Sequence, residues 1–155
     1  MIGAKILLVD DEAVFTANIS KLLNSRGYRA RAVNSGKDAV EILENETFDV
    51  IVLDLKMPGM DGITTLKEIQ ALGLFTETLI LTGHGSIDTA LEALKLGAYD
   101  YLTKPCEIDE LIAKIEGAWG KKDDAEKKDI QEKIHKAVES PRSALDVFPK
   151  KRPKH

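Results

Sequence analysis

The stretch VIVLDLKMPGMDG, residues 50–62, decides the fold of this chain, because it opens with the apolar run Val50–Leu53 and turns polar at Asp54. Short runs rich in Leu and β-branched residues are typical of parallel strands that helices cover on both faces. Two similar runs occur elsewhere in the chain, at Ile6–Val9 and Leu79–Leu81. Together the three runs predict the centre of a parallel β-sheet.

Weaker patterns on either side complete the sheet. The alternating run Tyr28–Val33 predicts an edge strand, and Tyr99–Thr103 predicts a fifth strand. Apolar residues spaced at roughly i, i+4 and i+7 predict a helix after each strand. The clearest such stripe consists of Ile108, Leu111, Ile112, Ile115 and Trp119. This alternation predicts an α/β fold of (βα)5 type, with an open, doubly wound, five-stranded parallel sheet in the order 2-1-3-4-5.

Polar residues follow the strands at the edge of the sheet where such folds bind their ligands. In open α/β sheets, ligands bind beyond the carboxyl ends of the central strands. The residues that this rule selects are Asp10, Asp11, Asp54, Thr82 and Lys104. We therefore expect these five side chains to meet in one crevice.

The chemistry of this set indicates a phosphoryl acceptor. Three carboxylates repel one another unless a cation compensates their charge, and oxygen ligands suit Mg²⁺. A carboxylate can act as a nucleophile and form an aspartyl phosphate. Phosphoryl transfer needs mainly alignment and neutralisation of charge, which a metal ion, a Lys ammonium and a hydroxyl can supply. Asp54, Mg²⁺, Lys104 and Thr82 make a complete set.

Four motifs at these strand ends resemble the signature segments of receiver domains from response regulators of two-component signalling. The motifs are LLVDDE (residues 7–12), VLDLKMPGMDG (52–62), LILTGHG (79–85) and DYLTKP (100–105). Each motif is weakly specific alone, but their joint placement is specific, and the resemblance covers about residues 4–119. It implies the flavodoxin-like version of the (βα)5 fold.

The resemblance also implies a role for individual residues. Asp54 would be the phosphoacceptor. Asp11 and Asp54 would bind Mg²⁺ directly together with the backbone carbonyl of Lys56, while Asp10 would act through a bound water. Thr82 would hydrogen-bond the phosphoryl group. The chain would catalyse only its own phosphorylation and dephosphorylation and would not otherwise be an enzyme.

Further residues beside this pocket have implied or open roles. Lys104 would pair with a phosphoryl oxygen, and its peptide bond to Pro105 would be cis. Tyr101 occupies the position of the family's switch aromatic, although packing alone also explains an aromatic residue there. His84, two residues after Thr82, is either an exposed loop residue or a functional neighbour of the pocket.

Partners follow from the same resemblance. A sensor histidine kinase or a phosphotransfer protein would donate the phosphoryl group. A downstream protein would bind the face formed by Ser86–Leu96, Tyr99–Thr103 and Ile108–Trp119, and a homodimer is possible. A phosphorelay intermediate and a constitutive scaffold are alternative roles, although a degenerate receiver would be expected to lack one of the five pocket residues.

Other classes fit the residues less well. Asp10 and Asp11 could simply cap a helix, but capping requires one acid and does not predict Asp54 or Lys104. A phosphohydrolase of the haloacid-dehalogenase type would place a second Asp two positions after the nucleophile, where this chain has Lys56. A flavin- or nucleotide-binding module would place glycines and hydroxyls after the first strand, where acids would repel phosphate.

Composition points to a cytoplasmic protein. Cys106 is the single cysteine, so an intrachain disulfide is excluded, and it is expected to be a small buried hydrophobe. No apolar run approaches the ~20 residues that cross a membrane, and the N-terminus lacks the pattern of a signal peptide. We therefore expect no membrane insertion.

Charge is distributed unevenly along the chain. Residues 121–155 contain 11 Lys and Arg against 7 Asp and Glu, for a net charge of +4. The totals of 22 and 26 leave 11 against 19 in residues 1–120, for a net charge of −8. Because residues 1–120 are net negative and DNA binding rests largely on Lys and Arg, direct DNA binding is not expected.

The expected division is a receiver domain over residues 1–120 and a charged extension over 121–155. Residues 121–129 read KKDDAEKKD, which is typical of a solvated helix face or a linker. An apolar stripe at Ile130, Ile134, Ala137 and Val138 predicts a possible short helix over 125–139, followed by a disordered basic end. The extension is too short for an ordinary output domain, so none is expected.

Overall fold

The five predicted strands form one parallel sheet in the computed structural model, which describes residues 3–56, 61–83 and 87–139. The order is β2-β1-β3-β4-β5, which confirms the predicted topology. The strands are β1 (Lys5–Val9), β2 (Arg29–Val33), β3 (Val50–Asp54), β4 (Glu77–Thr82) and β5 (Asp100–Thr103). Every residue of β3 and β4 is buried, as their continuous apolar runs predicted, whereas β2 lies at an edge and is largely exposed.

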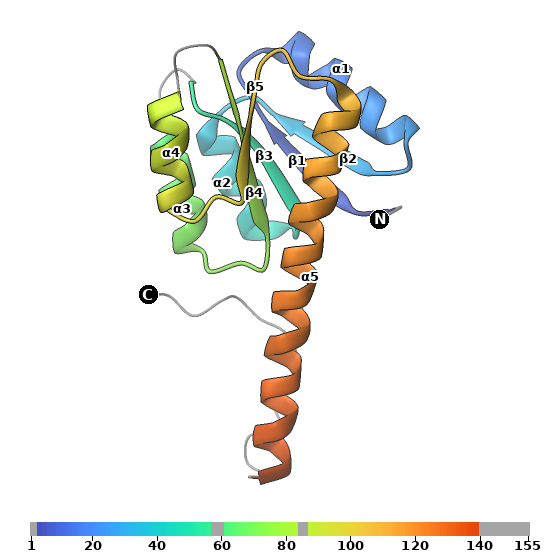
Figure 1. Cartoon of the computed structure of the whole chain (residues 1–155), viewed down its shortest axis with the longest axis vertical. Helices are drawn as coiled ribbons and strands as arrows, with labels where there is room; N and C mark the ends of the chain where they lie inside the picture. Colours follow the sequence, from blue (N-terminus) through green and yellow to red (C-terminus); the bar gives the residue numbers. More distant parts are fainter. Residues whose placement is uncertain (1–2, 57–60, 84–86, 140–155) are drawn as a thin grey trace.

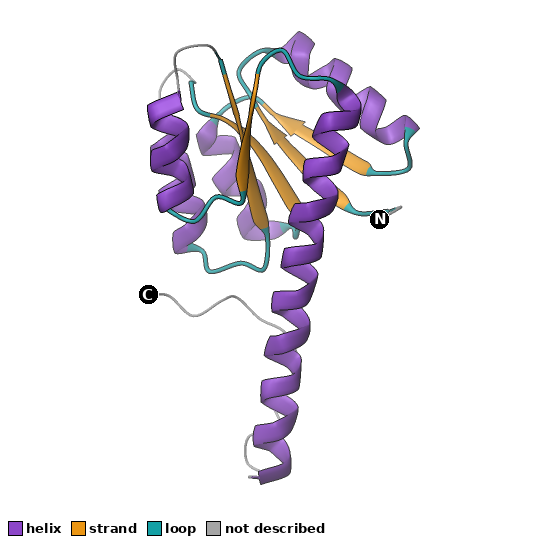
Figure 2. Cartoon of the chain, viewed as in Figure 1, coloured by secondary structure: helices purple, strands orange, loops and turns teal. Residues whose placement is uncertain are grey.

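Helices cover both faces of this sheet, so it forms the middle layer of three (Figure 2). The helices are α1 (Ala13–Ser25), α2 (Gly36–Asn45), α3 (Gly62–Ala71), α4 (Ile87–Lys95) and α5 (Ile108–Glu139). Leu7, Ile51 and Ile80 pack with residues of α2, α3 and α4 in one core cluster. The residue before each of them packs with α1 and α5 in the other, because successive side chains of a strand point to opposite faces.

Local signals in the sequence explain where several helices begin and end. Gly27 and Gly97 follow α1 and α4 with φ values of 94° and 109°, a conformation that favours glycine. Asp61 caps the start of α3, where its Oδ1 accepts a hydrogen bond from the amide of Thr64 at 2.8 Å. Because all the strand pairs are parallel, the carboxyl ends of the five strands lie at one edge of the sheet (Figure 1).

The last helix decides between two alternatives that the sequence left open. The sequence predicts either a solvated helix face or a linker for residues 121–129, and in the structure they belong to α5, one continuous helix of 32 residues, about 48 Å long. Ion pairs four residues apart bridge the charged stretch, at 2.9 Å for Lys127–Asp123 and 3.1 Å for Lys133–Asp129. Such pairs stabilise a helix by a few tenths of a kcal/mol each, roughly 0.2–0.5 kcal/mol. The second half of α5 therefore projects beyond the sheet (Figure 1).

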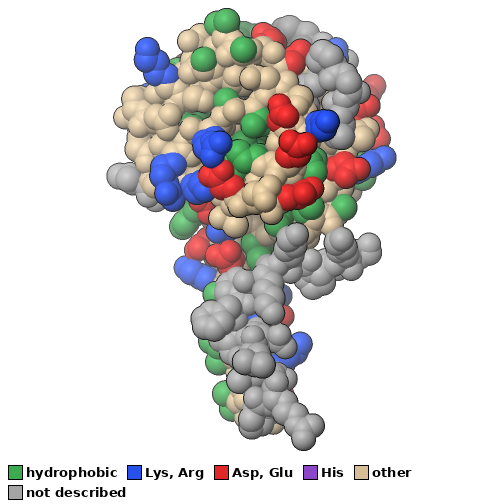
Figure 3. Space-filling model, turned by 180° about the vertical axis from the view of Figure 1, so that it is seen from behind, with side chains coloured by type: hydrophobic (Ala, Val, Ile, Leu, Met, Phe, Trp, Pro, Cys, Tyr) green, Lys and Arg blue, Asp and Glu red, His purple; other side chains and the backbone are tan. Residues whose placement is uncertain are grey.

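Two other expectations concern DNA binding and membrane insertion. On the face turned away from the viewer in Figure 1, acidic and basic side chains of the described residues are interspersed rather than gathered in one basic patch (Figure 3). None of the helices in the described part of the chain is long and apolar enough to cross a membrane. The expected disordered end falls within residues 140–155, outside the described residues.

Candidate functional site

Three carboxylates meet at the carboxyl ends of the two central strands. Val9 of β1 pairs with Leu53 of β3, so the next residues, Asp10 and Asp54, follow side by side at the ends of the two strands. One carboxylate oxygen from each of Asp10, Asp11 and Asp54 lies within 4.8 Å of the others. Asp10 and Asp54 are only 2% and 6% exposed, whereas Asp11 is exposed. The cluster is therefore a half-enclosed acidic pocket.

The electrostatics of this pocket call for a cation. Burial, and then the charge of Asp10, raise the pKa of Asp54 to about 6, and the charge of Asp11 contributes in the same direction. Lys104 and the backbone amide of Lys56 oppose this rise without cancelling it. A divalent cation among the three carboxylates would relieve their repulsion, and hard oxygen ligands of this kind fit Mg²⁺. The residues present thus match the predicted cofactor.

Lys104 supplies the positive charge that the protein itself brings to the pocket. It follows β5, and its Nζ lies 2.5 Å from Asp10 Oδ2 and 3.9 Å from Asp54 Oδ2. Burial would lower the pKa of Lys104, but the hydrogen bond to Asp10 and the charge of Asp54 raise it. The peptide bond between Lys104 and Pro105 is cis, as the resemblance implied. Lys104 is therefore held as a cation within reach of the acidic cluster.

Thr82 and Tyr101 lie on neighbouring strands beside the acidic pocket. Thr82 is the last residue of β4 and is 1% exposed, and its Oγ1 donates to the carbonyl of Gly83 at 3.4 Å. Asp54 pairs with Leu81, which places Thr82 one residue beyond that level. Tyr101 lies on β5 opposite Ile80 of β4. Its side chain is half-buried and packs against the core cluster that includes residues of α4. Thr82 and Tyr101 thus lie two register positions apart on adjacent strands, while their switch roles stay predictions.

The remaining predicted residues have mixed outcomes. The backbone amide of Lys56 donates to Asp54 Oδ1 at 3.3 Å, so Lys56 borders the pocket, while the metal-binding role of its carbonyl stays a prediction. His84 lies outside the described residues. Cys106 is half-buried against the cluster that includes α5, and burial raises the pKa of its thiol. This environment fits a packing residue.

Three residues around the pocket were not predicted from the sequence. Glu12, and not an aspartate, is the N-cap of α1, and Lys104 Nζ lies 3.3 Å from its Oε1. Asp10 instead uses Oδ1 to accept from the amide of Glu12 at 3.0 Å. Asn34 donates to the carbonyl of Asp10 at 2.9 Å, and the Phe15 ring lies 4.4 Å from Lys104 Nζ. The adjacency of Glu12 to the two aspartates was the only available signal.

Comparisons with known proteins agree with this geometry. The sequence model of the response regulator receiver domain matches residues 6–116. The transcriptional regulatory protein ZraR of Escherichia coli is 45% identical over 113 residues, which are 73% of this chain and 26% of ZraR. FixJ of Bradyrhizobium diazoefficiens is 40% identical over 113 residues, which are 73% of this chain and 55% of FixJ. The chain thus spans about a quarter to a half of the length of these relatives.

Solved structures give the same result. A response regulator receiver domain protein from Clostridium thermocellum is 37% identical, with a TM-score of 0.73 over 77% of this chain and 97% of that one. Full-length FixJ from B. japonicum is 34% identical, with a TM-score of 0.76 over 90% of this chain and 70% of that one. The fold, the acidic pocket and these matches lead to one conclusion: the chain belongs to the response regulator receiver domain family of two-component signalling.

Proposed function

We propose that this receiver accepts a phosphoryl group on Asp54, in a reaction that requires Mg²⁺, from a phosphohistidine of a sensor kinase or a phosphotransfer protein. The observation that carries the proposal is the position of Asp54. It is a buried carboxylate at the end of a central strand, among two further carboxylates and a lysine ammonium. Sites in the same position of open α/β sheets bind ligands.

Each residue of the pocket would have a separate role in phosphoryl transfer. Asp10, Asp11 and Asp54 would hold Mg²⁺, which supplies positive charge to the phosphoryl oxygens when bound. A carboxylate oxygen of Asp54 attacks phosphorus, and the bond between phosphorus and the histidine nitrogen breaks with its electron pair going to the nitrogen. Lys104 Nζ would turn from Asp10 toward a phosphoryl oxygen. The buried hydroxyl of Thr82 would donate to another.

We propose that the signal leaves through the surface of α4, β5 and α5. Ile87 and Leu91 of α4 are 40% and 46% exposed although they are large and apolar, so this surface offers contact area to a protein. Tyr101 is part of the same surface and packs toward the α4 side of the core. The relatives ZraR and FixJ are transcriptional regulatory proteins, and the matched region covers 26% and 55% of their lengths. This proposal therefore concerns the receiver and the surface through which it signals.

The proposal is tested with a small phosphodonor. Acetyl phosphate with Mg²⁺ should phosphorylate the wild type, and excess EDTA should abolish the reaction. Asp54→Asn should not react. The control, Asp49→Asn, makes the same substitution immediately before the start of β3 and should react normally. Undiminished phosphorylation of Asp54→Asn would overturn the proposal.

A further inference from the structure

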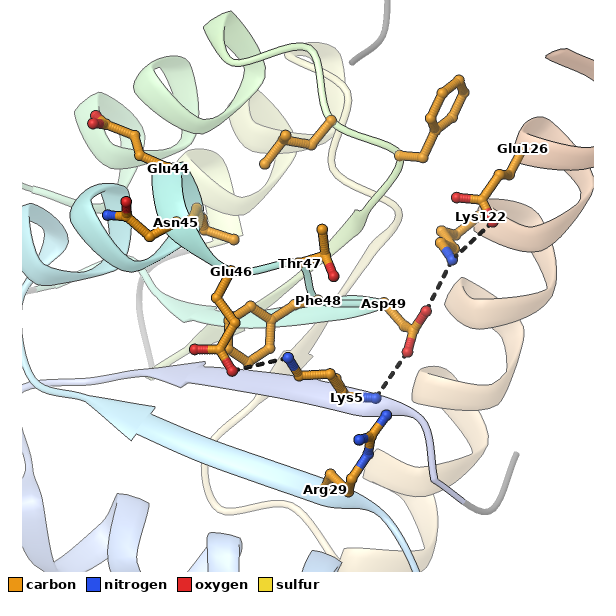
Figure 4. Close-up of a pocket in the computed structure, with 13 residues that line it drawn as sticks. Lys5, Arg29, Glu44, Asn45, Glu46, Thr47, Phe48, Asp49, Lys122 and Glu126 are labelled. Atoms are coloured by element: carbon orange, nitrogen blue, oxygen red, sulfur yellow. Dashed lines mark hydrogen bonds and ion pairs between the residues drawn. The ribbon is translucent and has the colours of Figure 1, made fainter. Parts of the chain in front are cut away.

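Asp49 connects two elements at the end of the sheet opposite to the acidic pocket. It lies immediately before β3, and its two carboxylate oxygens have different partners (Figure 4). Oδ2 accepts a hydrogen bond from the backbone amide of Lys5 in β1 at 2.8 Å. Oδ1 accepts one from Nζ of Lys122 in α5 at 2.9 Å. One carboxylate thus joins β1, the start of β3 and a helix that is 73 residues distant in sequence.

The contact between Asp49 and Lys122 is sheltered from solvent. The Lys122 side chain is 12% exposed and that of Asp49 is 23% exposed. Lys122 also lies 3.4 Å from Glu126 on the next turn of α5, and these residues border a cavity of about 600 Å³ (Figure 4). A charge-assisted hydrogen bond in such surroundings is stronger and less screened by salt than a surface ion pair.

A second lysine faces the neighbouring strand. Nζ of Lys121 lies 3.9 Å from the carboxylate of Glu77, the first residue of β4, whose side chain is only 4% exposed. The amide of Glu77 donates to the carbonyl of Asp49 at 3.4 Å, so the two acids start adjacent strands. Two successive lysines of α5 therefore face acids at the starts of β3 and β4.

These contacts occur where apolar packing of α5 ends. The buried residues of α5 are Leu111, Ile115 and Ala118, and the family match stops at residue 116. Residues 121–139, called the extension below, contain none of these buried residues. The ion pairs within the extension stabilise its helix, but they do not fix its direction relative to the sheet.

We propose that Asp49 is a positioning residue that ties the extension to the base of the sheet through Lys122, so that the folded receiver includes the start of the extension and gives it one fixed direction. This inference rests on the contacts of Asp49 and Lys122 and does not depend on phosphoryl transfer. Any partner or segment attached to the extension is then held in a defined orientation to the receiver. Without the contact, the extension frays and pivots about the end of the apolar packing.

Distance measurements between two spin labels test this directly. The labels are placed at Lys37→Cys on α2 and Lys136→Cys near the end of α5, both exposed positions, in a Cys106→Ala background. The full chain should give a narrow distance distribution. Asp49→Asn and Lys122→Met should broaden it, and amide exchange of residues 121–126 should accelerate about tenfold, as loss of a charged hydrogen bond implies. Asn at position 49 keeps one acceptor for the Lys5 amide.

Lys127→Met is the matched control. It removes a lysine from the same helix whose ion pair, to Asp123, lies within the extension. This variant should keep the narrow distribution, and all variants should keep the circular dichroism spectrum and the cooperative thermal unfolding of the wild type, which verifies folding. The proposal is overturned if the Asp49 and Lys122 variants match the wild type in both measurements. It is equally overturned if Lys127→Met broadens the distribution as much as they do.

Discussion

Lys104 Nζ lies 2.5 Å from Asp10 Oδ2 but 3.9 Å from Asp54 Oδ2, so this lysine is paired mainly with Asp10, a carboxylate of the proposed Mg²⁺ site. The ammonium thus pairs with a carboxylate that would bind Mg²⁺ under this proposal, and its charge would also repel the ion. Phosphorylation would offer it a more negative partner. Lys104 is therefore expected to oppose metal binding before transfer and to support the phosphoryl group afterwards.

Lys104→Met should separate these two effects. We expect it to tighten Mg²⁺ binding by roughly three- to tenfold, because a unit positive charge a few ångströms away is removed, and to slow phosphorylation by at least about tenfold. Titration calorimetry with Mg²⁺ and a phosphorylation time course measure the two quantities. Lys114→Met, which removes the partner of Asp100 on β5, is the control and should change neither. Weaker Mg²⁺ binding by Lys104→Met would contradict this account.

Asp54→Asn should stabilise the metal-free protein in a pH-dependent manner. The pKa of Asp54 is raised from 3.8 to about 6 by burial and by Asp10, so the folded state binds the proton more tightly than the unfolded state. Stability from this proton is complete below the unfolded pKa and is lost as pH rises through the folded one. In EDTA at about pH 7.5, the substitution should therefore raise the free energy of unfolding by about 1–3 kcal/mol.

The same comparison at low pH provides the check. As pH falls below the unfolded pKa of 3.8, the wild-type carboxyl becomes neutral in both states, so the advantage of the Asn variant should shrink toward zero. Urea unfolding across this range measures the difference. Adding Mg²⁺ at neutral pH should stabilise the wild type, since the ion binds the folded state. An Asn advantage that grows on acidification would show that the pKa of Asp54 is not raised.

Gly62→Ala should damage the receiver through its backbone. A Cβ at Gly62 would lie 2.3 Å from Cα of Leu55 and 2.8 Å from the carbonyl oxygen of Asp54, and backbone atoms cannot move aside as a side chain can. We expect a loss of at least about 1–3 kcal/mol in the free energy of unfolding. Gly120→Ala has open space around its Cβ and should stabilise α5 by up to ~1 kcal/mol. Thermal melts of both variants measure these changes, and an unchanged melting temperature for Gly62→Ala would show that the backbone near Gly62 can accommodate a Cβ.

Phosphorylation should change the surface formed by α4, β5 and α5. We expect beryllofluoride to shift amide resonances of residues 87–95, 100–103 and 108–119, because Thr82 would move toward the bound group and Tyr101 would turn inward. The energy gap is expected to be a few kcal/mol, so the free protein should already sample the active arrangement. Thr82→Ala and Tyr101→Ala should reduce the shifts on α4. Unchanged resonances on this surface would exclude the switch.

Much of the architecture could be predicted because it depends on patterns that are local in sequence. The apolar runs marked the three central strands, and the strand-end rule alone selected Asp10, Asp54 and Lys104 before any relative was considered. Parallel strands buried on both faces have a distinct pattern, and their carboxyl ends necessarily lie together. The acidic pocket follows from these two facts.

The rest depended on contacts between residues distant in sequence. The Asp49–Lys122 contact and the hydrogen bond from Asn34 to Asp10 join side chains that no local pattern relates. The charged stretch after Gly120 was ambiguous, because a solvated helix face and a linker have the same composition. Its helical state depends on ion pairs within the helix and on Lys122 reaching the sheet, and neither is visible before the chain is folded.

The central claim, that Asp54 is the phosphoacceptor, is tested most directly by trapping the acyl phosphate. The wild-type protein is phosphorylated with acetyl phosphate and Mg²⁺, reduced with borohydride, which converts an aspartyl phosphate to homoserine, and mapped by peptide mass spectrometry. Homoserine is expected at position 54, with unmodified aspartate at positions 10 and 11. Homoserine at either of those positions, or a phosphoryl group recovered on another residue type, would contradict it.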